Sequence, residues 1–301
     1  MIPMIPLVIL LLSLVLSWLL ISPVSLSSNI SIDPLNDLRG KRVVITGASL
    51  GIGRSLAFEV AKAGVLSLVI ASRSTEKLRV VKDAIELLYN ETTIHIVEVD
   101  LSSDETSQSL ITESVSLMGG IDYLILNHIT SSRYGTWLVD NKKDGQGFVS
   151  EMFHVNTFSY IWLATAAMPY LKQSNGKIAV VSSLASHIGI PKTAIYAATK
   201  HALGGFFNSL RLELKYLGID VSITICSIGA TDTEGASVVK DKLNAQLVKF
   251  DPPEYAARAI LRGTAMQMRQ IYHPHYQVFP MIIIAHYFPA LAERILLLSL
   301  V

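Results

Sequence analysis

Tyr196 and Lys200 are the residues whose types and spacing most directly indicate chemistry in this sequence. They belong to the segment Tyr-Ala-Ala-Thr-Lys at the start of an apolar helical stretch, so both side chains share one helix face. An ammonium beside a phenol stabilises the phenolate, which lowers the tyrosine pKa from about 10 towards neutrality and suits proton exchange with an alcohol or a carbonyl. Alone, the pair is a weak motif, because Tyr-x-x-x-Lys also occurs on ordinary helix surfaces.

Ser183 ends a predicted buried strand shortly before this pair. A parallel sheet binds ligands at the carboxyl ends of its strands, where the hydroxyl can hydrogen-bond a carbonyl oxygen. Ser182 is an alternative for the same role, and a serine that only caps the following turn is the alternative without chemistry. Together with the glycine loop described next, the serine and the helical pair form a strong combined signal.

The segment Thr-Gly-Ala-Ser-Leu-Gly-Ile-Gly at residues 46–53 directly follows a predicted strand and precedes an apolar helical pattern. Gly47 permits a tight turn, Gly51 lets the backbone approach a pyrophosphate, and Gly53 allows the helix to touch the strand. The free N–H groups and the positive dipole end of the helix favour an anion. The segment therefore predicts a dinucleotide-binding loop. The expected contacts are Gly47, Ser49, Leu50, Gly51, Ile52 and Gly53.

The end of the second predicted strand distinguishes between the two nicotinamide dinucleotides. An NAD site places an acidic residue there to bind the ribose 2′-hydroxyl, whereas this chain has Ser72 and Arg73. A guanidinium pairs with a 2′-phosphate through two parallel hydrogen bonds, so we expect NADP(H) as the cofactor. The alternative is an exposed Arg73 that forms a salt bridge elsewhere. Asp100, after the third strand, is expected either to accept a hydrogen bond from the adenine amino group or to cap a helix.

Short β-branched runs alternate with helical stretches along most of the chain, and this order is typical of a parallel sheet. The runs are apolar at every position, as strands covered by helices on both faces are. The sequence therefore predicts an α/β fold with a doubly wound parallel sheet of the Rossmann type in a single domain. The predicted strands cover residues 43–45, 66–71, 94–99, 123–126, 178–181 and 221–225.

Composition and charge exclude several classes of protein. Of the 301 residues, 50% are hydrophobic and 16% are charged, which excludes a disordered chain. The 25 Lys and Arg residues balance 24 Asp and Glu residues, so no nucleic-acid partner is expected. The single cysteine, Cys226, excludes an intramolecular disulfide framework and a Cys-rich zinc site, and no metal site is predicted. Cys226 is expected to be a small hydrophobic residue on a strand.

Residues 1–32 contain no charged side chain and form an apolar leader. The almost entirely apolar residues 7–21, with their flanks, are long enough to span a bilayer, so a membrane anchor helix is predicted. A cleaved signal peptide is the alternative. The small residues 22–28 favour cleavage, whereas the missing basic n-region and the missing Ala-x-Ala-like site oppose it. The prediction is a single-pass membrane protein, or a secreted protein if the leader is cleaved.

Two indications disagree on the side of the membrane that carries the domain, and the side stays open. Arg39, Lys41 and Arg42 follow the leader and favour a cytoplasmic domain, although they also open the folded domain. Two N-glycosylation sequons, at Asn29 and Asn90, favour a lumenal domain and a glycoprotein.

The C-terminal residues 279–301 carry only Glu293 and Arg294 among mostly apolar residues, and Pro280 and Pro289 are expected to interrupt any helix. An apolar surface helix that contacts lipid or a second subunit is predicted, and a helix that closes the domain core is the alternative. The predicted division of the chain is a leader at 1–32, a cofactor-binding domain at 38–272 and an apolar segment at 273–301. Within the domain, the excursion at residues 232–251 is predicted to form a lid over a ligand.

These motifs together resemble the short-chain dehydrogenase/reductase family over nearly the whole of residues 38–272. Within the family, residues 117–130, 171–176 and 182–185 are most similar to the 11-beta-hydroxysteroid dehydrogenases, which also carry an apolar leader. The positions that match the family motifs are residues 46–53, Asp100, Asn127 in Leu-Asn-His-Ile, Asn156 in Val-Asn-Thr-Phe-Ser-Tyr, Ser183, Tyr196 and Lys200.

The resemblance implies a catalytic tetrad. Tyr196 would be the acid or base, Lys200 would lower its pKa and hold the nicotinamide ribose, and Ser183 would position the carbonyl. Asn156 would hold a water in the proton relay. The resemblance also implies a homodimer built on helices that include the one carrying Tyr196. The further cofactor contacts that it implies are Asn127, Thr233 at the nicotinamide end, Tyr196 and Lys200.

Three departures from the family pattern bear on these expectations. Leu50 stands where relatives that use NADP often carry a basic residue, which removes one phosphate contact. The segment Ser227-Ile228-Gly229 replaces Pro-Gly, a change expected to affect loop shape more than chemistry. The leader lacks the basic residues that precede it in the steroid enzymes.

The sequence thus predicts an NADP(H)-dependent oxidoreductase of the endoplasmic reticulum membrane that interconverts a secondary alcohol and a ketone on a lipophilic, steroid-like substrate. Apolar residues near the predicted site, such as Ile129, Leu184 and Ile188, suit such a substrate, although core packing produces the same composition. Retinoids and other lipid carbonyls are close alternatives. A noncatalytic, cofactor-bound membrane scaffold is the alternative from another class, and the intact tetrad favours the enzyme.

Overall fold

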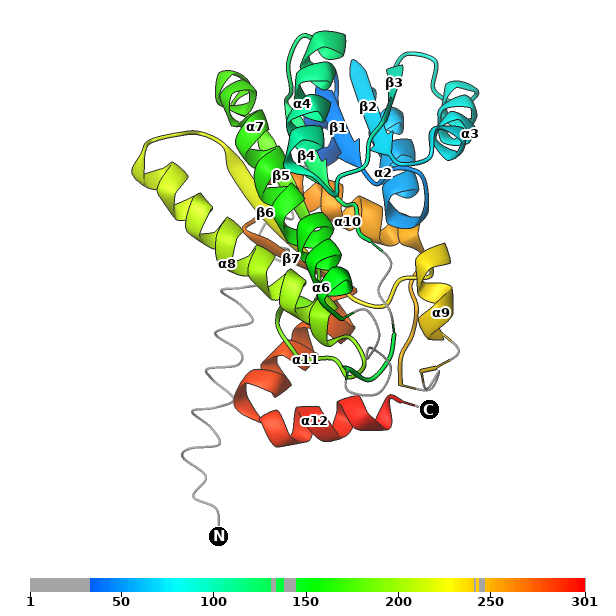
Figure 1. The fold of residues 1–301 in the computed structure, drawn as a ribbon. Coiled ribbons are helices and arrows are strands. Elements are labelled where there is room, and N and C mark those ends of the chain that lie inside the picture. Colours follow the sequence, from blue (N-terminus) through cyan, green and yellow to red (C-terminus); the bar gives the residue numbers. More distant parts are fainter. Residues whose placement is uncertain (1–32, 131–133, 138–144, 241, 244–246, 301) are drawn as a thin grey trace.

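A seven-stranded parallel sheet forms the centre of the structure, a computed structural model (Figure 1). The structure describes residues 33–130, 134–137, 145–240, 242–243 and 247–300. The strand order is β3-β2-β1-β4-β5-β6-β7, and every neighbouring pair is parallel. The predicted Rossmann-type sheet is therefore confirmed. Its winding reverses between β1 and β4, the place at which such sheets bind dinucleotides.

The first six strands lie where the apolar β-branched runs predict them. The central strands are buried along almost their whole length because helices cover both faces of the sheet, which explains why they lack polar alternation. The strands are β1 (Arg42–Thr46), β2 (Ser67–Ser72), β3 (Thr93–Glu98), β4 (Tyr123–Leu126), β5 (Lys177–Ser183) and β6 (Ser222–Ile228). The sequence pattern does not predict β7 (Gln270–His273), a short edge strand in which only Ile271 is buried.

Helices form a layer on each face of the sheet (Figure 1). One layer contains α2 (Gly51–Lys62), α3 (Thr75–Glu86) and α10 (Pro253–Ala265), whose apolar side chains share one core cluster. The other contains α4 (Asp104–Met118), α7 (Ser159–Ser174) and α8 (Ala194–Tyr216), which share the second. The helix α6 (Gly145–Phe153) continues into α7 through η2 (His154–Phe158), one turn of π-helix.

Paired charges occupy the amino-terminal ends of three central strands. Arg42 of β1 holds Asp122 with two side-chain hydrogen bonds of 2.9 and 3.0 Å. Lys177 of β5 pairs with Asp37, which also accepts a hydrogen bond from the Tyr123 hydroxyl of β4. Burial raises the pKa values of both aspartates, but the hydrogen bonds from their cationic partners outweigh it and lower the pKa values below normal. These charges are therefore satisfied within the fold.

The excursion after β6 contains η4 (Glu234–Ala236) and α9 (Ser237–Lys240). Thr231 and Asp251 form a parallel bridge at its base, and the backbone N–H of Asp232 donates to the Asp251 carbonyl at 2.8 Å. This closed base makes the excursion a loop that begins and ends beside the carboxyl end of β6. Its function as a lid stays a prediction.

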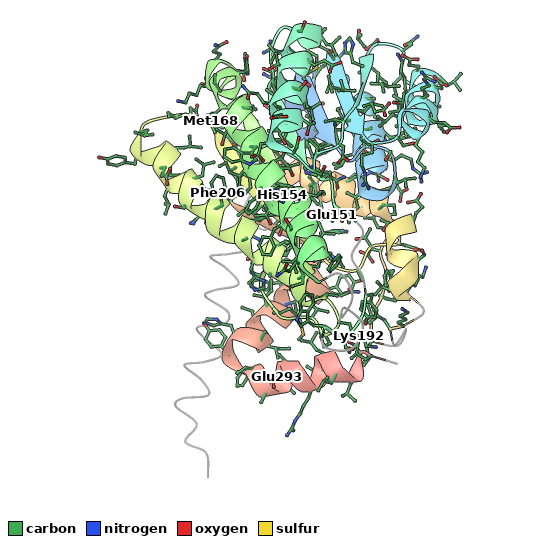
Figure 2. All side chains as sticks on the ribbon, in the orientation of Figure 1. Glu151, His154, Met168, Lys192, Phe206 and Glu293 are labelled. Atoms are coloured by element: carbon green, nitrogen blue, oxygen red, sulfur yellow. The ribbon has the colours of Figure 1, made fainter. Side chains whose placement is uncertain are left out.

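Two apolar helices, α11 (His275–Tyr287) and α12 (Pro289–Leu298), lie at one end of the molecule, where Figure 2 also shows Lys192 and Glu293. Pro280 does not interrupt α11, and that expectation is wrong. Proline there removes only the hydrogen bond to the carbonyl of Tyr276, an exposed residue near the start of the helix. Pro289 does mark a break, because it begins α12. Within these two helices only Val278 and Ala292 are buried, so the pair does not close the core.

The predicted anchor helix and the sequon at Asn29 lie outside the described residues. In the part of the chain that is described, no helix combines the length and the apolar character needed to cross a bilayer. Asn90 is exposed in the turn before β3, and Cys226 is buried on β6 as predicted.

Candidate active site

The glycine segment forms a tight turn from β1 into α2. Gly47 and Gly51 have φ angles of +68° and +53°, which glycine adopts without strain. At Gly53, a Cβ atom would lie 2.0 Å from the carbonyl oxygen of Gly47, so no side chain fits between the turn and the helix. Leu50 is the residue before α2 and provides no side-chain cap, while Ser49 and Ile52 flank it and are partly buried. The turn thus has the tight geometry predicted of a phosphate-binding loop.

Asn127, directly after β4, holds this turn in place. Its Nδ2 donates to the carbonyls of Thr46 and Gly47 at 3.3 and 3.2 Å. Its backbone N–H donates to the Thr46 hydroxyl at 3.0 Å. Asn127 therefore contributes to the predicted cofactor site by fixing the shape of the loop.

A carboxylate from the excursion after β6 lies at the N-terminus of α2. Glu234 accepts a hydrogen bond from the Gly51 backbone N–H at 3.1 Å and lies 3.6 Å from the Arg54 guanidinium. Thr233, the predicted contact at the nicotinamide end, packs beside Gly51, with Cγ2 2.9 Å from where a Cβ would stand. No motif predicts Glu234. Its position is explained by the preference of a helix N-terminus for an anion.

The residues predicted to select the cofactor lie next to the glycine turn. Thr46 at the end of β1 pairs with Ala71 of β2, so Ser72 and Arg73 follow at the same edge. Arg73 is exposed and forms no ion pair with any described residue, so the salt-bridge alternative is not realised there. The Ser72 hydroxyl accepts a hydrogen bond from the Ser74 N–H at 3.2 Å.

Asp100 is exposed at the end of the neighbouring strand β3. Its Oδ1 accepts a hydrogen bond from the Ser102 N–H at 3.1 Å. Ser103 caps α4, so the expectation that Asp100 caps this helix is wrong. Asp100 instead closes a local turn that precedes the cap.

Ser183 and Tyr196 lie near each other at the carboxyl edge of the sheet, close enough for the Ser183 hydroxyl to lower the pKa of Tyr196 through hydrogen bonding. The Ser183 hydroxyl also accepts a hydrogen bond from the Ala185 N–H at 3.1 Å, so the turn-capping alternative and the contact with Tyr196 both occur. The Ser182 hydroxyl is buried and has no hydrogen-bond partner among the described residues. Ser183, and not Ser182, is therefore the serine next to Tyr196.

Lys200 lies one turn after Tyr196 on α8 and is only 1% exposed. Its Nζ donates to the Val181 carbonyl at 3.1 Å. The same nitrogen lies 5.8 Å from the ring centroid of Tyr196 and 5.1 Å from that of Tyr160. No described carboxylate forms an ion pair with Lys200, and burial lowers its pKa to about 7.

The pKa of Tyr196 differs from the sequence-based expectation. Burial raises it, and the hydrogen bond from Ser183 offsets only part of the increase. The expectation of a lowered pKa fails for the chain alone because the same buried surroundings also disfavour the charged form of Lys200. In this state the phenol is protonated and suited to act as an acid.

Asn156 lies on the π-helical turn η2 and is fully buried. Its Oδ1 accepts a hydrogen bond from the Thr130 N–H at 3.0 Å. The turn contacts α8, because the Thr157 hydroxyl donates to the Thr199 carbonyl at 3.2 Å, next to Lys200. Single π-helical turns often mark functional sites. The structure thus brings all four residues of the predicted tetrad to one region of the sheet edge.

His128 forms a buried network beside the tetrad that no sequence motif predicts. Its Nδ1 lies 2.7 Å from the Thr46 hydroxyl and its Nε2 lies 2.6 Å from the Ser159 hydroxyl. Its ring contacts that of Tyr160 at a centroid distance of 4.5 Å. Burial, and secondarily the charge of Lys200, lowers the His128 pKa to about 3, so the imidazole is neutral. Its position directly after Asn127 is the only sequence signal that could have identified it.

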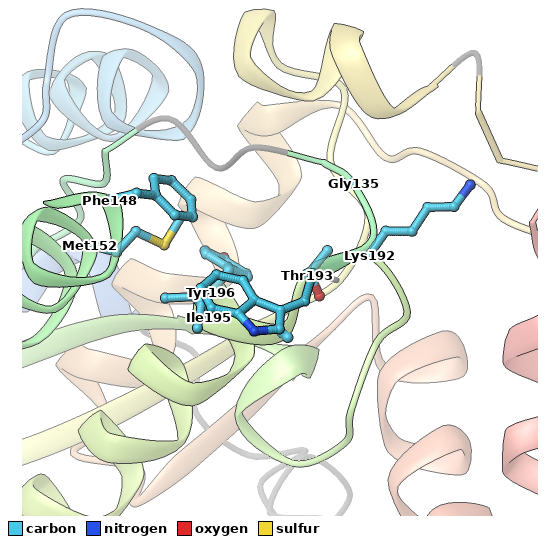
Figure 3. Close-up of a pocket in the computed structure, with 9 residues that line it drawn as sticks. Gly135, Phe148, Met152, Lys192, Thr193, Ile195 and Tyr196 are labelled. Carbon is cyan, nitrogen blue, oxygen red and sulfur yellow. The ribbon is translucent and has the colours of Figure 1, made fainter. Parts of the chain in front are cut away.

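A narrow, mostly apolar pocket opens beside Tyr196 (Figure 3). In this view Phe148 and Met152 of α6 face Tyr196 and Ile195 of α8. The pocket is lined by Gly135, Trp137, Phe148, Met152, Lys192, Thr193, Ala194, Ile195 and Tyr196. Ile129, Leu184 and Ile188, the apolar residues expected near the site, do not line this pocket. Ile129 is half exposed and Ile188 is buried.

Comparison with known proteins agrees with this geometry. A sequence profile described as short chain dehydrogenase matches residues 41–244. A relative from Xenopus tropicalis, described as hydroxysteroid 11-beta-dehydrogenase 1-like protein, is 40% identical over 262 residues, covering 86% of this chain and 87% of the relative. A relative from Gallus gallus with the same description is 38% identical over 237 residues, 79% of each chain. The resemblance stated from the motifs is therefore confirmed.

Two solved structures have a similar fold. An alcohol dehydrogenase from the archaeon Thermococcus sibiricus, complexed with 5-hydroxy-NADP, covers 77% of this chain and 95% of its own at a TM-score of 0.66 and 22% identity. Levodione reductase covers 80% and 98%, at a TM-score of 0.70 and 17% identity. At these identities the similarity concerns the fold.

We expect Lys200→Met to stabilise the fold. Burial lowers the Lys200 pKa from 10.5 to about 7, so the buried charge destabilises the native state fully below about pH 7. As the pH rises from there towards 10.5, the unfolded chain holds the extra proton and the wild type gains stability. The variant should be more stable by about 3 kcal/mol at pH 6 and by less at pH 9, measured by urea unfolding. Lys172→Met, at an exposed position of α7, is the control, and equal stability of Lys200→Met and the wild type at pH 6 would contradict the prediction.

We expect Glu234→Gln to strengthen the binding of the nicotinamide dinucleotide. The Glu234 carboxylate accepts a hydrogen bond from the Gly51 N–H and places negative charge at the helix N-terminus where a pyrophosphate would bind. Glutamine has the same shape as glutamate but carries no charge. The dissociation constant, measured by titration calorimetry at low salt, should fall about two- to fivefold. Glu254→Gln, exposed on α10, controls for net charge. Unchanged or weaker binding would show that the carboxylate does not compete.

Proposed function

Because the chain belongs to the short-chain dehydrogenase family, we propose that it is an NADP(H)-dependent oxidoreductase that interconverts a secondary alcohol and a ketone on a lipophilic, hydroxysteroid-like substrate. One observation carries the proposal. Ser183, Tyr196 and Lys200 converge at the carboxyl edge of the sheet, beside an apolar pocket and next to the glycine turn. The cofactor of the family is a nicotinamide dinucleotide, and the choice of NADP(H) rests on the residues of this chain.

The residues around the glycine turn fit a dinucleotide with a 2′-phosphate. A Cβ at Gly53 would clash with the Gly47 carbonyl oxygen, so the turn packs directly on α2, and the N-terminus of α2 favours an anion such as the pyrophosphate. Arg73 is exposed beside the turn with no described ion-pair partner, and serine precedes it where an NAD site has an acidic residue. Gly47, Gly53 and Asn127 would shape the turn around the pyrophosphate, and Arg73 would pair with the 2′-phosphate. When bound, the nicotinamide ring donates or accepts the hydride.

The chain's own residues orient the carbonyl and move one proton. In reduction, the Ser183 hydroxyl donates a hydrogen bond to the carbonyl oxygen, and the Tyr196 hydroxyl delivers a proton to that oxygen. In oxidation, Tyr196 takes the proton back. The raised pKa of Tyr196 keeps it protonated in the free chain, which favours the acid role, and the charge of Lys200 stabilises the phenolate formed by proton transfer.

The pocket supports a lipophilic substrate. Trp137, Phe148, Met152 and Ile195 present apolar surface around the hydroxyl-bearing side chain of Tyr196. The curated relatives are described as hydroxysteroid 11-beta-dehydrogenase 1-like, which names the same chemical class for them. A flat polycyclic ketone combines apolar surface with one polar group, and it would enter only if the lining side chains move apart, because the cavity volume is about 10 Å³.

The apolar ends of the chain support an association with the endoplasmic reticulum membrane. Tyr287 and Phe288 are half exposed between α11 and α12, and Leu297 and Leu298 of α12 are exposed at 62% and 66%. Side chains of this kind insert into a lipid interface. The leader at 1–32 would provide the anchor.

A homodimer is part of the proposal. Trp162 of α7 and Leu212 of α8 are exposed at 43% and 63%, and α8 is the helix that carries Tyr196. Large apolar side chains on adjacent helices favour burial against a second copy.

We expect Tyr196→Phe to lower the turnover of a lipophilic ketone with NADPH by about 10²- to 10⁴-fold, because the phenylalanine fills the site but carries no proton. The measurement is NADPH oxidation with a panel of steroid and retinoid ketones. Tyr216→Phe, at a 90% exposed position, is the matched control. Turnover of the Tyr196→Phe variant equal to that of the control would overturn the proton-donor assignment.

We expect Arg73→Asp to shift the preference from NADP(H) towards NAD(H). The carboxylate would repel a 2′-phosphate and accept a hydrogen bond from a 2′-hydroxyl. The ratio of the two kcat/KM values should change by about 10²-fold, the effect of losing a charge-assisted pair. Arg79→Asp, an equal charge change on an exposed position of α3, should leave the ratio unchanged. A ratio of the two kcat/KM values in the Arg73→Asp variant equal to that of the wild type would falsify the assignment.

A further inference from the structure

The ammonium of Lys200 lies against the aromatic face of Tyr160, a residue outside the tetrad. The Nζ atom is 5.1 Å from the Tyr160 ring centroid, closer than its 5.8 Å to that of Tyr196. Tyr160 belongs to α7 and is fully buried. A cation within about 6 Å of a ring face is attracted by the ring quadrupole, and the attraction strengthens where water is excluded.

The groups that face Lys200 from the surrounding elements provide no negative charge. Tyr196 on α8 is protonated, His128 after β4 is neutral, and the contact from β5 is the carbonyl of Val181. No ion pair in the described part of the chain reaches the lysine. The Val181 carbonyl and the rings of Tyr160 and Tyr196, of which Tyr160 is the nearer, thus compensate for the loss of water around the ammonium.

Two contacts with His128 fix the orientation of the Tyr160 ring. Its hydroxyl donates to the His128 carbonyl at 2.7 Å, and its ring rests on the His128 imidazole. The imidazole is bound at both nitrogens, to Thr46 at the end of β1 and to Ser159 at the start of α7. Because β1 also carries the glycine turn, the orientation of Tyr160 depends on the same strand that positions the cofactor loop.

We propose that Tyr160 is a positioning residue for the proton-transfer step, whose aromatic ring holds the ammonium of Lys200 protonated and in place beside Tyr196, with His128 orienting that ring. The inference rests on the proposed function for its catalytic meaning, but the contact itself exists without substrate. Its consequence is that the electron density of one aromatic ring determines how much of Lys200 is charged near neutral pH. Burial alone lowers the pKa of this lysine to about 7, so a modest stabilisation of the charged form changes its population strongly.

The test varies the ring quadrupole while keeping the shape of the side chain. Phenylalanine, 3,5-difluorophenylalanine and 3,4,5-trifluorophenylalanine are placed at position 160 of the full chain. The titration of Lys200 is then followed by proton–carbon NMR of chains labelled with ¹³C at lysine Cε, and the Lys200 signal is the one missing from Lys200→Met. We expect the midpoint to fall stepwise with fluorination, by about one pH unit from phenylalanine to the trifluoro ring.

Tyr160→Phe is the matched control, since it keeps the ring and removes only the hydrogen bond to His128. Its midpoint should stay close to that of the wild type. A midpoint that does not change along the fluorinated series would overturn the proposal, and so would a fall in Tyr160→Phe as large as that of the trifluoro ring, which would assign the effect to the hydroxyl. The titration of Lys200 is measured without a substrate. Failure of the proposed function would appear as no turnover of any ketone, so it is distinguished from failure of this inference.

Discussion

The burial of one ammonium without a carboxylate partner is the constraint on which the site depends. Lys200 is almost completely removed from water, and a carboxylate would satisfy it but would also neutralise its effect on the neighbouring phenol. The chain instead surrounds it with weak acceptors, the Val181 carbonyl and two aromatic rings. Such contacts stabilise a cation less than an ion pair does, and they leave its field directed at Tyr196. The cost is a lysine that loses its proton near neutral pH.

This constraint explains why residues from distant segments must be fixed so closely. The Tyr160 ring that contacts Lys200 comes from α7, whose start directly follows the π-helical turn that carries Asn156. The same ring is tied through His128 to Thr46, and Thr46 also binds the backbone of Asn127, which holds the glycine turn. A shift of β1 would therefore move the cofactor loop and the surroundings of Lys200 together. The surroundings of Lys200 and the glycine turn are thus parts of one network of hydrogen bonds and aromatic contacts.

The sequence was sufficient for the features that depend on local patterns. Apolar β-branched runs predicted six strands, and glycine spacing predicted the turn at Gly47 and Gly53, because close packing there excludes any side chain. The strand β7 gave no signal because three of its four residues are only partly buried. His128, Tyr160 and Glu234 were missed for a different reason: each acts through a partner from a distant segment, and no spacing records such a contact. The raised pKa of Tyr196 likewise depends on how deeply the assembled site is buried.

The two ends of the sheet differ in how completely they pair their charged groups, and this difference separates stability from chemistry. At the amino-terminal end, Arg42 pairs with Asp122 and Lys177 pairs with Asp37, so each buried charge has its opposite. At the carboxyl end, neither Lys200 nor the Ser182 hydroxyl has a partner of this kind among the described residues: the lysine has no counter-ion and the hydroxyl has no hydrogen bond. Glu234 lies there where an anionic ligand is expected. Unsatisfied groups cost free energy, and a fold tolerates them only where the remaining structure holds them. The ion pairs at the amino-terminal end stabilise the sheet, and this stability lets groups at the carboxyl end stay without partners. Groups without partners are available to exchange protons with a substrate and to hydrogen-bond a cofactor.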